Sequence, residues 1–138
     1  MEKRIIGSAE LVSIAELNNY HVYAKIDTGA KSSSLHCDTI VHKDGMVHFT
    51  IHQKGKNPQR NSYTVPVAMI KTVRSSNGIS EQRIFVNLSI QIGGTVQQSL
   101  VSLTDRSSMK YSMLIGRRFL AGRYLVDCAE KNLIGVSI

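Results

Sequence analysis

The stretch Ala24-Lys25-Ile26-Asp27-Thr28-Gly29-Ala30 decides how this chain is interpreted. An apolar, β-prone run from Tyr20 to Ile26 predicts a strand that delivers the Asp27 carboxylate to a turn. Gly29 permits backbone angles that other residues resist. We expect the Thr28 hydroxyl and the N–H groups of Gly29 and Ala30 to hold the carboxylate oxygens. An aspartate held in this way suits the activation of water, although Asp-x-Gly also occurs in ordinary turns.

A second apolar strand ends in glycine far downstream, at Met113-Leu114-Ile115-Gly116-Arg117. The order Asp-Thr-Gly-Ala, then apolar-apolar-Gly-Arg, resembles the retropepsin-like aspartic proteases, which share the fold of retroviral proteases. In that family the first motif carries the catalytic aspartate, and the second packs beneath it as its pseudo-symmetric partner. The resemblance therefore implies that Asp27 is catalytic.

The match is closer to a bacterial retropepsin-like aspartic endopeptidase family that is often labelled ATP-dependent zinc protease. The shared blocks span most of the chain in the family's order. They are Lys25 to Ala30, Ser34-Leu35-His36, Arg106 with Met109, Met113 to Arg117, and Ala121-Gly122-Arg123 with Val126-Asp127.

Length and composition indicate a single soluble domain over residues 1–138. No stretch approaches the run of about 20 apolar residues that a membrane span requires. The segment from Met1 to Gly7 lacks the apolar region of a signal peptide, so we expect a cytoplasmic protein that binds no membrane. Two cysteines, Cys37 and Cys128, predict reduced and partly buried thiols rather than a disulfide framework.

The formal net charge of +7 favours acidic partners. The basic residues are scattered singly and aromatic residues are few, which argues against nucleic acid as the partner. An acidic peptide suits the same charge.

Short β-prone runs divided by turn signals recur along the chain, and helical periodicity is scarce, which predicts an all-β barrel or sandwich. The resemblance narrows this to the closed, retropepsin-like β-barrel of the acid protease fold, with one short helix from Arg117 to Ala121 that Gly122 ends. An exposed loop is expected at 54–61 and tight turns at 43–45 and 93–94. The expected strands cover residues 5–14, 20–26, 35–41, 46–52, 63–73, 82–92, 95–103, 113–115, 124–127 and 133–138.

The retropepsin order also assigns the hairpin tip from Arg74 to Ser80, which includes Asn77 and Gly78, as the flap that closes over substrate. Pro66 lacks an N–H group, so the strand expected over 63–73, which contains it, should lie at the edge of its sheet or be irregular at this residue.

In the related proteases two aspartates face each other across a dimer axis and share one proton, because two like charges so close cannot both ionise cheaply. This chain carries one Asp-Thr-Gly, so the resemblance implies a homodimer with paired Asp27 carboxylates. Thr28 would brace the partner's loop through its hydroxyl, and Gly29 and Ala30 would supply backbone contacts.

Arg117 departs from the retroviral pattern, in which the corresponding arginine pairs with an aspartate placed just after Asp-Thr-Gly-Ala. Here that position is Lys31, which would repel it. Two alternatives remain: Arg117 pairs elsewhere, with Asp38 or Asp127 as candidates, or Arg117 and Lys31 both face an acidic ligand.

Asp105 and Arg106 fall where related enzymes line the substrate groove. Arg106 could clamp a carboxylate through two hydrogen bonds. Asp105 could be a second acid in a monomeric enzyme, or the two residues could form a loop ion pair. His36 is expected to hydrogen-bond near the catalytic loop or to serve a structural role.

The sequence offers little support for zinc or ATP. His48 and His52 share one face of a strand but lie about 13 Å apart along it, too far for one metal ion. Neither a His-Glu-x-x-His helix nor a Gly-x-x-x-x-Gly-Lys-Ser/Thr loop is present. We therefore predict neither a metal site nor a cofactor.

These observations favour an aspartic endopeptidase that acts as a homodimer. Members of the resembled family often occur beside ATP-grasp ligases that append glutamates to proteins, which implies acidic or glutamate-rich peptide tails as substrates. One alternative is a non-catalytic peptide-binding module on the same fold. A zinc-dependent peptidase is the third.

Overall fold

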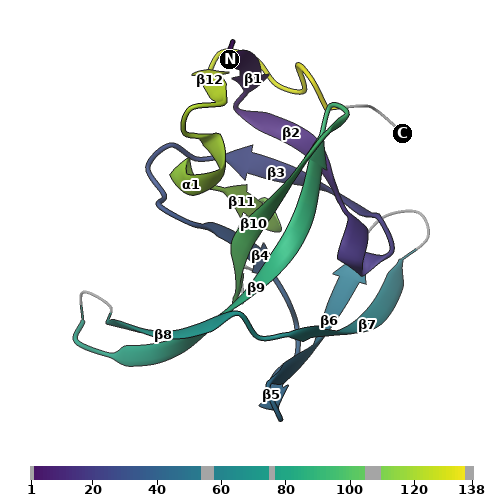
Figure 1. The fold of residues 1–138 in the computed structure, drawn as a ribbon, viewed down its shortest axis with the longest axis vertical. Helices are drawn as coiled ribbons and strands as arrows, with labels where there is room; N and C mark the ends of the chain where they lie inside the picture. Colours follow the sequence, from purple (N-terminus) through teal and green to yellow (C-terminus); the bar gives the residue numbers. More distant parts are fainter. Residues whose placement is uncertain (1, 54–57, 75–76, 105–109, 136–138) are drawn as a thin grey trace.

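The chain is built almost entirely of β-strands (Figure 1). The computed structural model describes residues 2–53, 58–74, 77–104 and 110–135. Within these ranges, strands alternate with tight turns, and one 3-10 helix and one short α-helix interrupt them. The elements are β1 Arg4–Gly7, β2 Ala9–Ile14, η1 Ala15–Leu17, β3 Tyr20–Ile26, β4 Ser33–His36, β5 Ile40–Lys43, β6 Met46–Gln53, β7 Gln59–Pro66, β8 Met69–Arg74, β9 Ser80–Ile92, β10 Thr95–Thr104, β11 Met113–Ile115, α1 Arg117–Leu120 and β12 Tyr124–Asp127.

Six of the strands close into a barrel. They are hydrogen-bonded in the order β10-β4-β11-β3-β2-β9, and β9 pairs back to β10. β8 continues the sheet beyond β9 and forms with it the hairpin that projects from the barrel in Figure 1. The predicted closed all-β barrel with one short helix is confirmed.

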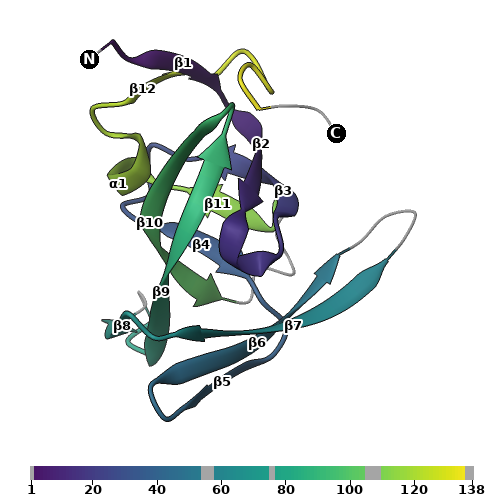
Figure 2. The same ribbon diagram turned by 45° about the vertical axis from the view of Figure 1, so that its right-hand side comes forward.

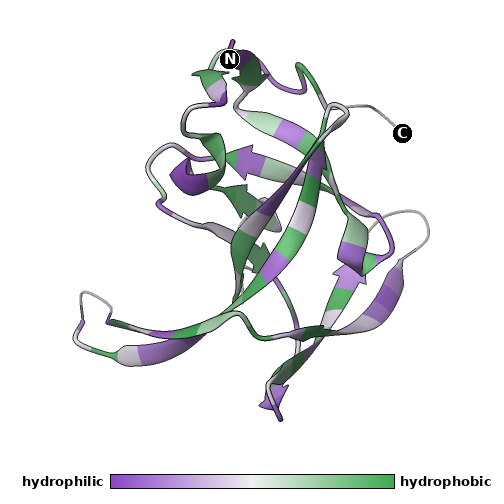
Figure 3. Ribbon diagram, in the orientation of Figure 1, coloured by the Kyte–Doolittle hydropathy of each residue, from purple (hydrophilic) through white to green (hydrophobic). Residues whose placement is uncertain are grey.

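Two smaller sheets complete the fold. β5, β6 and β7 form an antiparallel sheet below the barrel (Figure 2), and β1 pairs in parallel with β12. The β5–β6–β7 sheet contributes Val47, Phe49 and Ile51 to the same buried core as the barrel strands. Figure 3 shows the underlying pattern, with apolar and polar residues alternating along β3 and β9. Alternation of this kind sends every second side chain into the core.

Several short-range signals in the sequence were reliable, although the strands expected over 5–14 and 35–41 are each divided in two. β3 covers residues 20–26 and β12 covers 124–127, as expected. The two predicted tight turns also form: Asp44 and Gly45 both have positive φ angles, and so do Gly93 and Gly94. Such angles are typical of the two-residue turns that join twisted antiparallel strands.

The expected strand over 63–73 and the loop before it are corrected. β7 already begins at Gln59, and residues 54–57 lie outside the described residues. β7 ends at Pro66 on the edge of its sheet, and a new strand begins at Met69 in a different sheet. Pro66 faces Met46, the first residue of β6, and the Val67 N–H still donates to the Gly45 carbonyl (2.9 Å), so the pairing ends at the turn before β6 and not at the missing N–H. The edge position expected for the strand that contains this proline is confirmed.

Both cysteines are free thiols, as predicted. Cys37 is buried, and burial, with a smaller contribution from Asp38, raises the pKa of its thiol far above the ordinary value. Cys128 is exposed, which corrects the expectation of partial burial.

A buried carboxylate binds residues 133–135, the described part of the strand expected at 133–138. Residues 133–135 form no strand, and 136–138 lie outside the described residues. Glu10, on β2, is fully buried. Both of its carboxylate oxygens accept hydrogen bonds from backbone N–H groups, those of Gly7 (2.7 Å), Leu133 (2.8 Å), Ile134 (3.1 Å) and Gly135 (2.7 Å). One side chain thus satisfies donors that a sheet would otherwise pair.

Glu10→Gln is expected to lower the free energy of unfolding by about 3 kcal/mol, because hydrogen bonds to a charged acceptor are strong and a buried amide would face N–H donors with its own NH₂ group. Chemical denaturation measures the change. Glu16→Gln is the control, since Glu16 is exposed and, among the described residues, accepts bonds only from Ser89. Its cost should stay below about 1 kcal/mol. Equal losses in both variants would contradict the role given to Glu10.

Candidate active site

Asp27 directly follows β3, and its side chain lies on the outward-facing side of that strand. Ala24 and Ile26 point into the barrel and are buried, whereas Lys25 is exposed and the Asp27 side chain is 28% exposed. The Asp27 N–H donates to the carbonyl of Ile115 (2.9 Å), which continues the parallel pairing of β3 with β11. The Gly29 N–H donates to Asp27 Oδ1 (2.9 Å). The carboxylate is therefore fixed in position and still accessible.

The turn is closed differently from the expectation. The Ala30 N–H donates to the backbone carbonyl of Asp27 (3.2 Å) instead of the carboxylate, because the turn uses this bond to reverse the chain. Gly29 is not among the residues with positive φ. A Cβ there would lie 3.2 Å from Asp27 Oδ1, so the glycine serves the close approach of its backbone to the carboxylate. Thr28 is exposed at the surface.

The segment after β11 supports this loop from below. The Arg117 N–H donates to the Ala30 carbonyl (2.8 Å), the Arg118 N–H donates to the Lys31 carbonyl (3.1 Å), and the Gly116 N–H donates to Ser33 Oγ (3.1 Å). A Cβ on Gly116 would lie 2.7 Å from the carbonyl oxygen of Ser32 and 2.8 Å from that of Ala30. The two motifs found in the sequence therefore pack backbone against backbone.

Arg117 pairs with neither predicted aspartate. Its Nη1 donates to the Thr28 carbonyl (3.1 Å). Asp38 instead bonds the ring of His36 (3.0 Å), and Asp127 accepts the N–H of Ala129 (3.0 Å). A neutral carbonyl thus takes the place of the aspartate that retroviral enzymes use to bind this arginine. The position of that aspartate is occupied here by Lys31, which is exposed.

Lys25 is the cation nearest the carboxylate among the described ion pairs. Its Nζ lies 4.0 Å from Asp27 Oδ2, and its side chain is 47% exposed. An ammonium group at this distance contributes little to stability when water reaches both partners. It does place a positive charge beside the accessible Asp27 carboxylate.

His36 lies at the opposite end of β4 from the Asp27 loop, which corrects its placement as support for that loop. β4 runs antiparallel to β11, so Ser33 lies beside Gly116 while His36 N–H bonds the carbonyl of Ser112 (2.8 Å). The strand direction, which the sequence alone could not give, decides this.

The hairpin proposed as the flap extends on the same side of the barrel as the β3–β4 loop in Figures 1 and 2. Arg74 ends β8 opposite Ser80, and Gly78 has a positive φ angle near the tip, next to Asn77. Residues 75–76 lie outside the described residues, as do Asp105 and Arg106.

Two contributions were missed by sequence reasoning. Ser33 is one of three consecutive serines, and nothing in the sequence distinguishes it from its neighbours. Glu10 carried a signal, since it is an acidic residue within the otherwise apolar-rich run from Ala9 to Ile14.

The described residues hold neither a metal-binding cluster nor a helix that could span a membrane. The parts of the chain that the structure describes contain no group of three or more His, Cys, Asp or Glu side chains placed to hold a metal ion. In those same parts, no helix has the length and apolar character needed to cross a membrane.

A closed barrel whose Asp-Thr-Gly turn rests on a Gly-Arg segment defines a retropepsin-like domain. A model of the RimB-like family, described as retropepsin-like aspartic endopeptidase RimB, matches residues 5–136. The chain therefore belongs to the RimB-like family, and the family and fold expected from the sequence are confirmed.

The curated relatives are longer proteins with a different name. Probable alpha-L-glutamate ligases of Shewanella pealeana and Shewanella halifaxensis are each 34% identical to this chain over 143 residues, and that of Parasynechococcus marenigrum is 32% identical. Each match covers 96% of this chain but 30% of the relative, so the chain spans less than a third of their length.

A similar structure is also known. The crystal structure of a Legionella pneumophila protein of unknown function is 29% identical and superposes with a TM-score of 0.76. The match covers 96% of this chain and 99% of that one, so the two share one architecture from end to end.

Proposed function

We propose that this chain is one subunit of an aspartic endopeptidase in which two Asp27 carboxylates share a proton. One carboxylate removes a proton from water while the other protonates the oxygen of the scissile carbonyl, and the hydroxide adds to the carbon. The tetrahedral intermediate then breaks its C–N bond as a proton passes to the leaving nitrogen. The product is a carboxylic acid and an amine.

This proposal rests on the hydrogen bonds that hold Asp27 and its loop in position. The Gly29 N–H fixes one carboxylate oxygen, and the 115–118 segment holds the loop from below. Such support keeps a catalytic group within the narrow geometry that proton transfer requires.

The dimer follows from the count of one Asp-Thr-Gly per chain. Thr28 and Gly29 are exposed and Asp27 is partly exposed, so a second copy can approach them. A two-fold axis would bring identical loops together in an isologous interface.

For the substrate we propose acidic, glutamate-rich peptides. The net charge of +7 and the ammonium group of Lys25, 4.0 Å from Asp27 Oδ2, both favour anionic side chains next to the scissile bond. The relatives named probable alpha-L-glutamate ligases fit this class, because a ligase that adds glutamate makes a product with acidic side chains.

Lys25→Met is expected to raise KM for glutamate-rich peptides by about tenfold, because it removes the cation beside the reacting carboxylate. Glutamine-containing peptides should be cleaved poorly by both forms. Peptide hydrolysis at low and physiological salt measures the effect. The control is Lys43→Met: Lys43 lies on β5, far from Asp27, so this variant should leave KM unchanged. A preference for apolar residues at every position, insensitive to salt, would contradict the acidic substrate class.

A non-catalytic peptide-binding module is the second candidate. The curated relatives favour it in one respect, since they carry this domain within larger proteins named ligases. A zinc-dependent peptidase would lose activity to a chelator and regain it with zinc, a result that would overturn the aspartic mechanism. Replacement of Asp27, argued in the Discussion, separates the enzyme from the binding module.

A further inference from the structure

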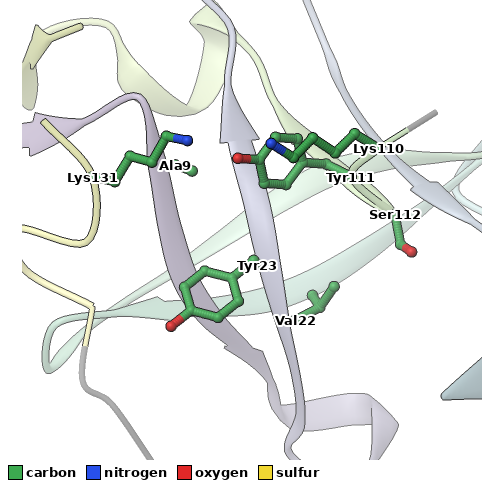
Figure 4. Close-up of a pocket in the computed structure, with 7 residues that line it drawn as sticks. All are labelled: Ala9, Val22, Tyr23, Lys110, Tyr111, Ser112 and Lys131. Atoms are coloured by element: carbon green, nitrogen blue, oxygen red, sulfur yellow. The ribbon is translucent and has the colours of Figure 1, made fainter. Parts of the chain in front are cut away.

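A pocket of about 390 Å³ lies on the outer surface of the barrel, away from the loop of Asp27. The start of β2, strand β3, the segment before β11 and the loop after β12 each contribute to it (Figure 4). Its walls combine small apolar groups, aromatic rings and two lysines. The lining residues are Ala9, Val22, Tyr23, Lys110, Tyr111, Ser112 and Lys131.

The two lysines give the pocket its charge. In Figure 4 the ammonium group of Lys131 points toward the side of the pocket formed by Lys110 and Tyr111. Lys110 Nζ lies 5.6 Å from the centre of the Tyr111 ring, and within the described parts of the chain neither lysine takes part in an ion pair. The buried carboxylate of Glu10 is saturated by backbone N–H groups. The pocket therefore carries two ammonium groups that form no ion pair in these parts of the chain.

The pocket is connected to Asp27 by the outward face of β3. Tyr23, Lys25 and Asp27 occupy alternate positions, and Ala9 of the pocket pairs in register with Lys25. Asp27 follows Tyr23 by four positions along the strand, a span of about 13 Å. An extended peptide covers the same distance in about four residues. Lys25 lies between the two ends of this span.

We propose that the pocket binds a glutamate side chain of the peptide, about four residues from the bond that is cleaved. The ammonium groups of Lys110 and Lys131 hold the carboxylate, and the rings of Tyr23 and Tyr111 pack against its methylene groups. This inference rests on the proposed function for the identity of the ligand. It adds a second recognition point, so the chain selects peptides with several consecutive glutamates over peptides with one.

The test uses binding to the full chain carrying Asp27→Asn, so that no cleavage is needed. The probe is a fluorescein-labelled peptide of five glutamates, followed by fluorescence anisotropy. Adding Lys110→Met and Lys131→Met should weaken binding by about tenfold, because two charge-assisted contacts are lost. The control, Lys43→Met with Arg60→Met, removes the same charge from the separate β5–β6–β7 sheet and should change binding less than about twofold. Thermal unfolding confirms that both double variants are folded.

The outcomes separate this inference from the proposed function. Binding that weakens in the pocket variant and not in the control variant supports the pocket, even if the wild-type chain cleaves no peptide. Absence of cleavage would contradict only the proposed peptidase activity. Equal loss in both double variants shows a general effect of charge and overturns the pocket. Unchanged binding together with wild-type cleavage of glutamate peptides also overturns the pocket and leaves the peptidase standing.

Discussion

Asp27→Asn is expected to reduce the rate of peptide cleavage by about a thousandfold or more, since general acid–base catalysis contributes 10²–10⁴-fold in typical enzymes. An amide can neither accept the proton of the attacking water nor donate one to the carbonyl. The substitution keeps the shape of the side chain and an oxygen that can accept the Gly29 N–H, so the loop should keep its geometry. The measurement is kcat with a glutamate-rich peptide.

Two further results define this experiment. Binding of the same peptide should persist in Asp27→Asn, because recognition depends on the cations around the site. Asp38→Asn is the matched control: that carboxylate bonds His36 at the far end of β4, so its loss should leave kcat unchanged. A chain that binds acidic peptides without cleaving them, whether or not Asp27 is intact, would be a binding module.

Gly116→Ala should destabilise the fold by about 3 kcal/mol or more, at the upper end of what overpacking a close-packed site costs. The new methyl group would lie 2.7 Å from the Ser32 carbonyl oxygen and 2.8 Å from that of Ala30. Both obstacles are backbone atoms, so no side chain can rotate away to make room. Relief requires the Asp27 loop to separate from the 115–118 segment. Chemical denaturation should show the loss, and catalysis should fall with it.

Gly122→Ala is the control for this prediction. Gly122 follows α1 with φ +80°, and a Cβ there would meet no atom within 4 Å. The cost should be only that of a left-handed backbone angle in a non-glycine residue, about 1 kcal/mol. If Gly116→Ala were no more harmful than Gly122→Ala, the close contact between the two motifs would not matter to the fold.

Local signals explain what could be predicted from the sequence. Alternating residues set the bounds of β3, and the Asp44-Gly45 and Gly93-Gly94 pairs set two hairpin turns. These features depend on neighbours in the chain, so they survive without knowledge of the rest of the fold. The turn at Asp27 could be predicted for the same reason, and the second motif indicated which segment packs against it.

Long-range contacts explain the errors. Residues 133–135 bond to Glu10, more than 120 positions earlier, and no local pattern reveals that a carboxylate will replace a neighbouring strand. His36 was misplaced because its motif neighbours do not reveal the direction of β4. Arg117 bonds the Thr28 carbonyl, whereas the residue charges in the sequence suggested an aspartate or an acidic ligand as its partner.

Mixing of wild-type and Asp27→Asn subunits shows whether two copies of Asp27 form one catalytic site. A fixed amount of wild-type chain is equilibrated with increasing amounts of Asp27→Asn chain, and cleavage of a glutamate-rich peptide in excess is measured. Random pairing at equal amounts leaves about half of the wild-type chains in wild-type dimers. If each site needs two intact Asp27 carboxylates, activity falls to about half there and toward about a tenth at tenfold excess. Activity that stays constant at every ratio would show that one chain carries a complete site and would contradict the paired-carboxylate mechanism.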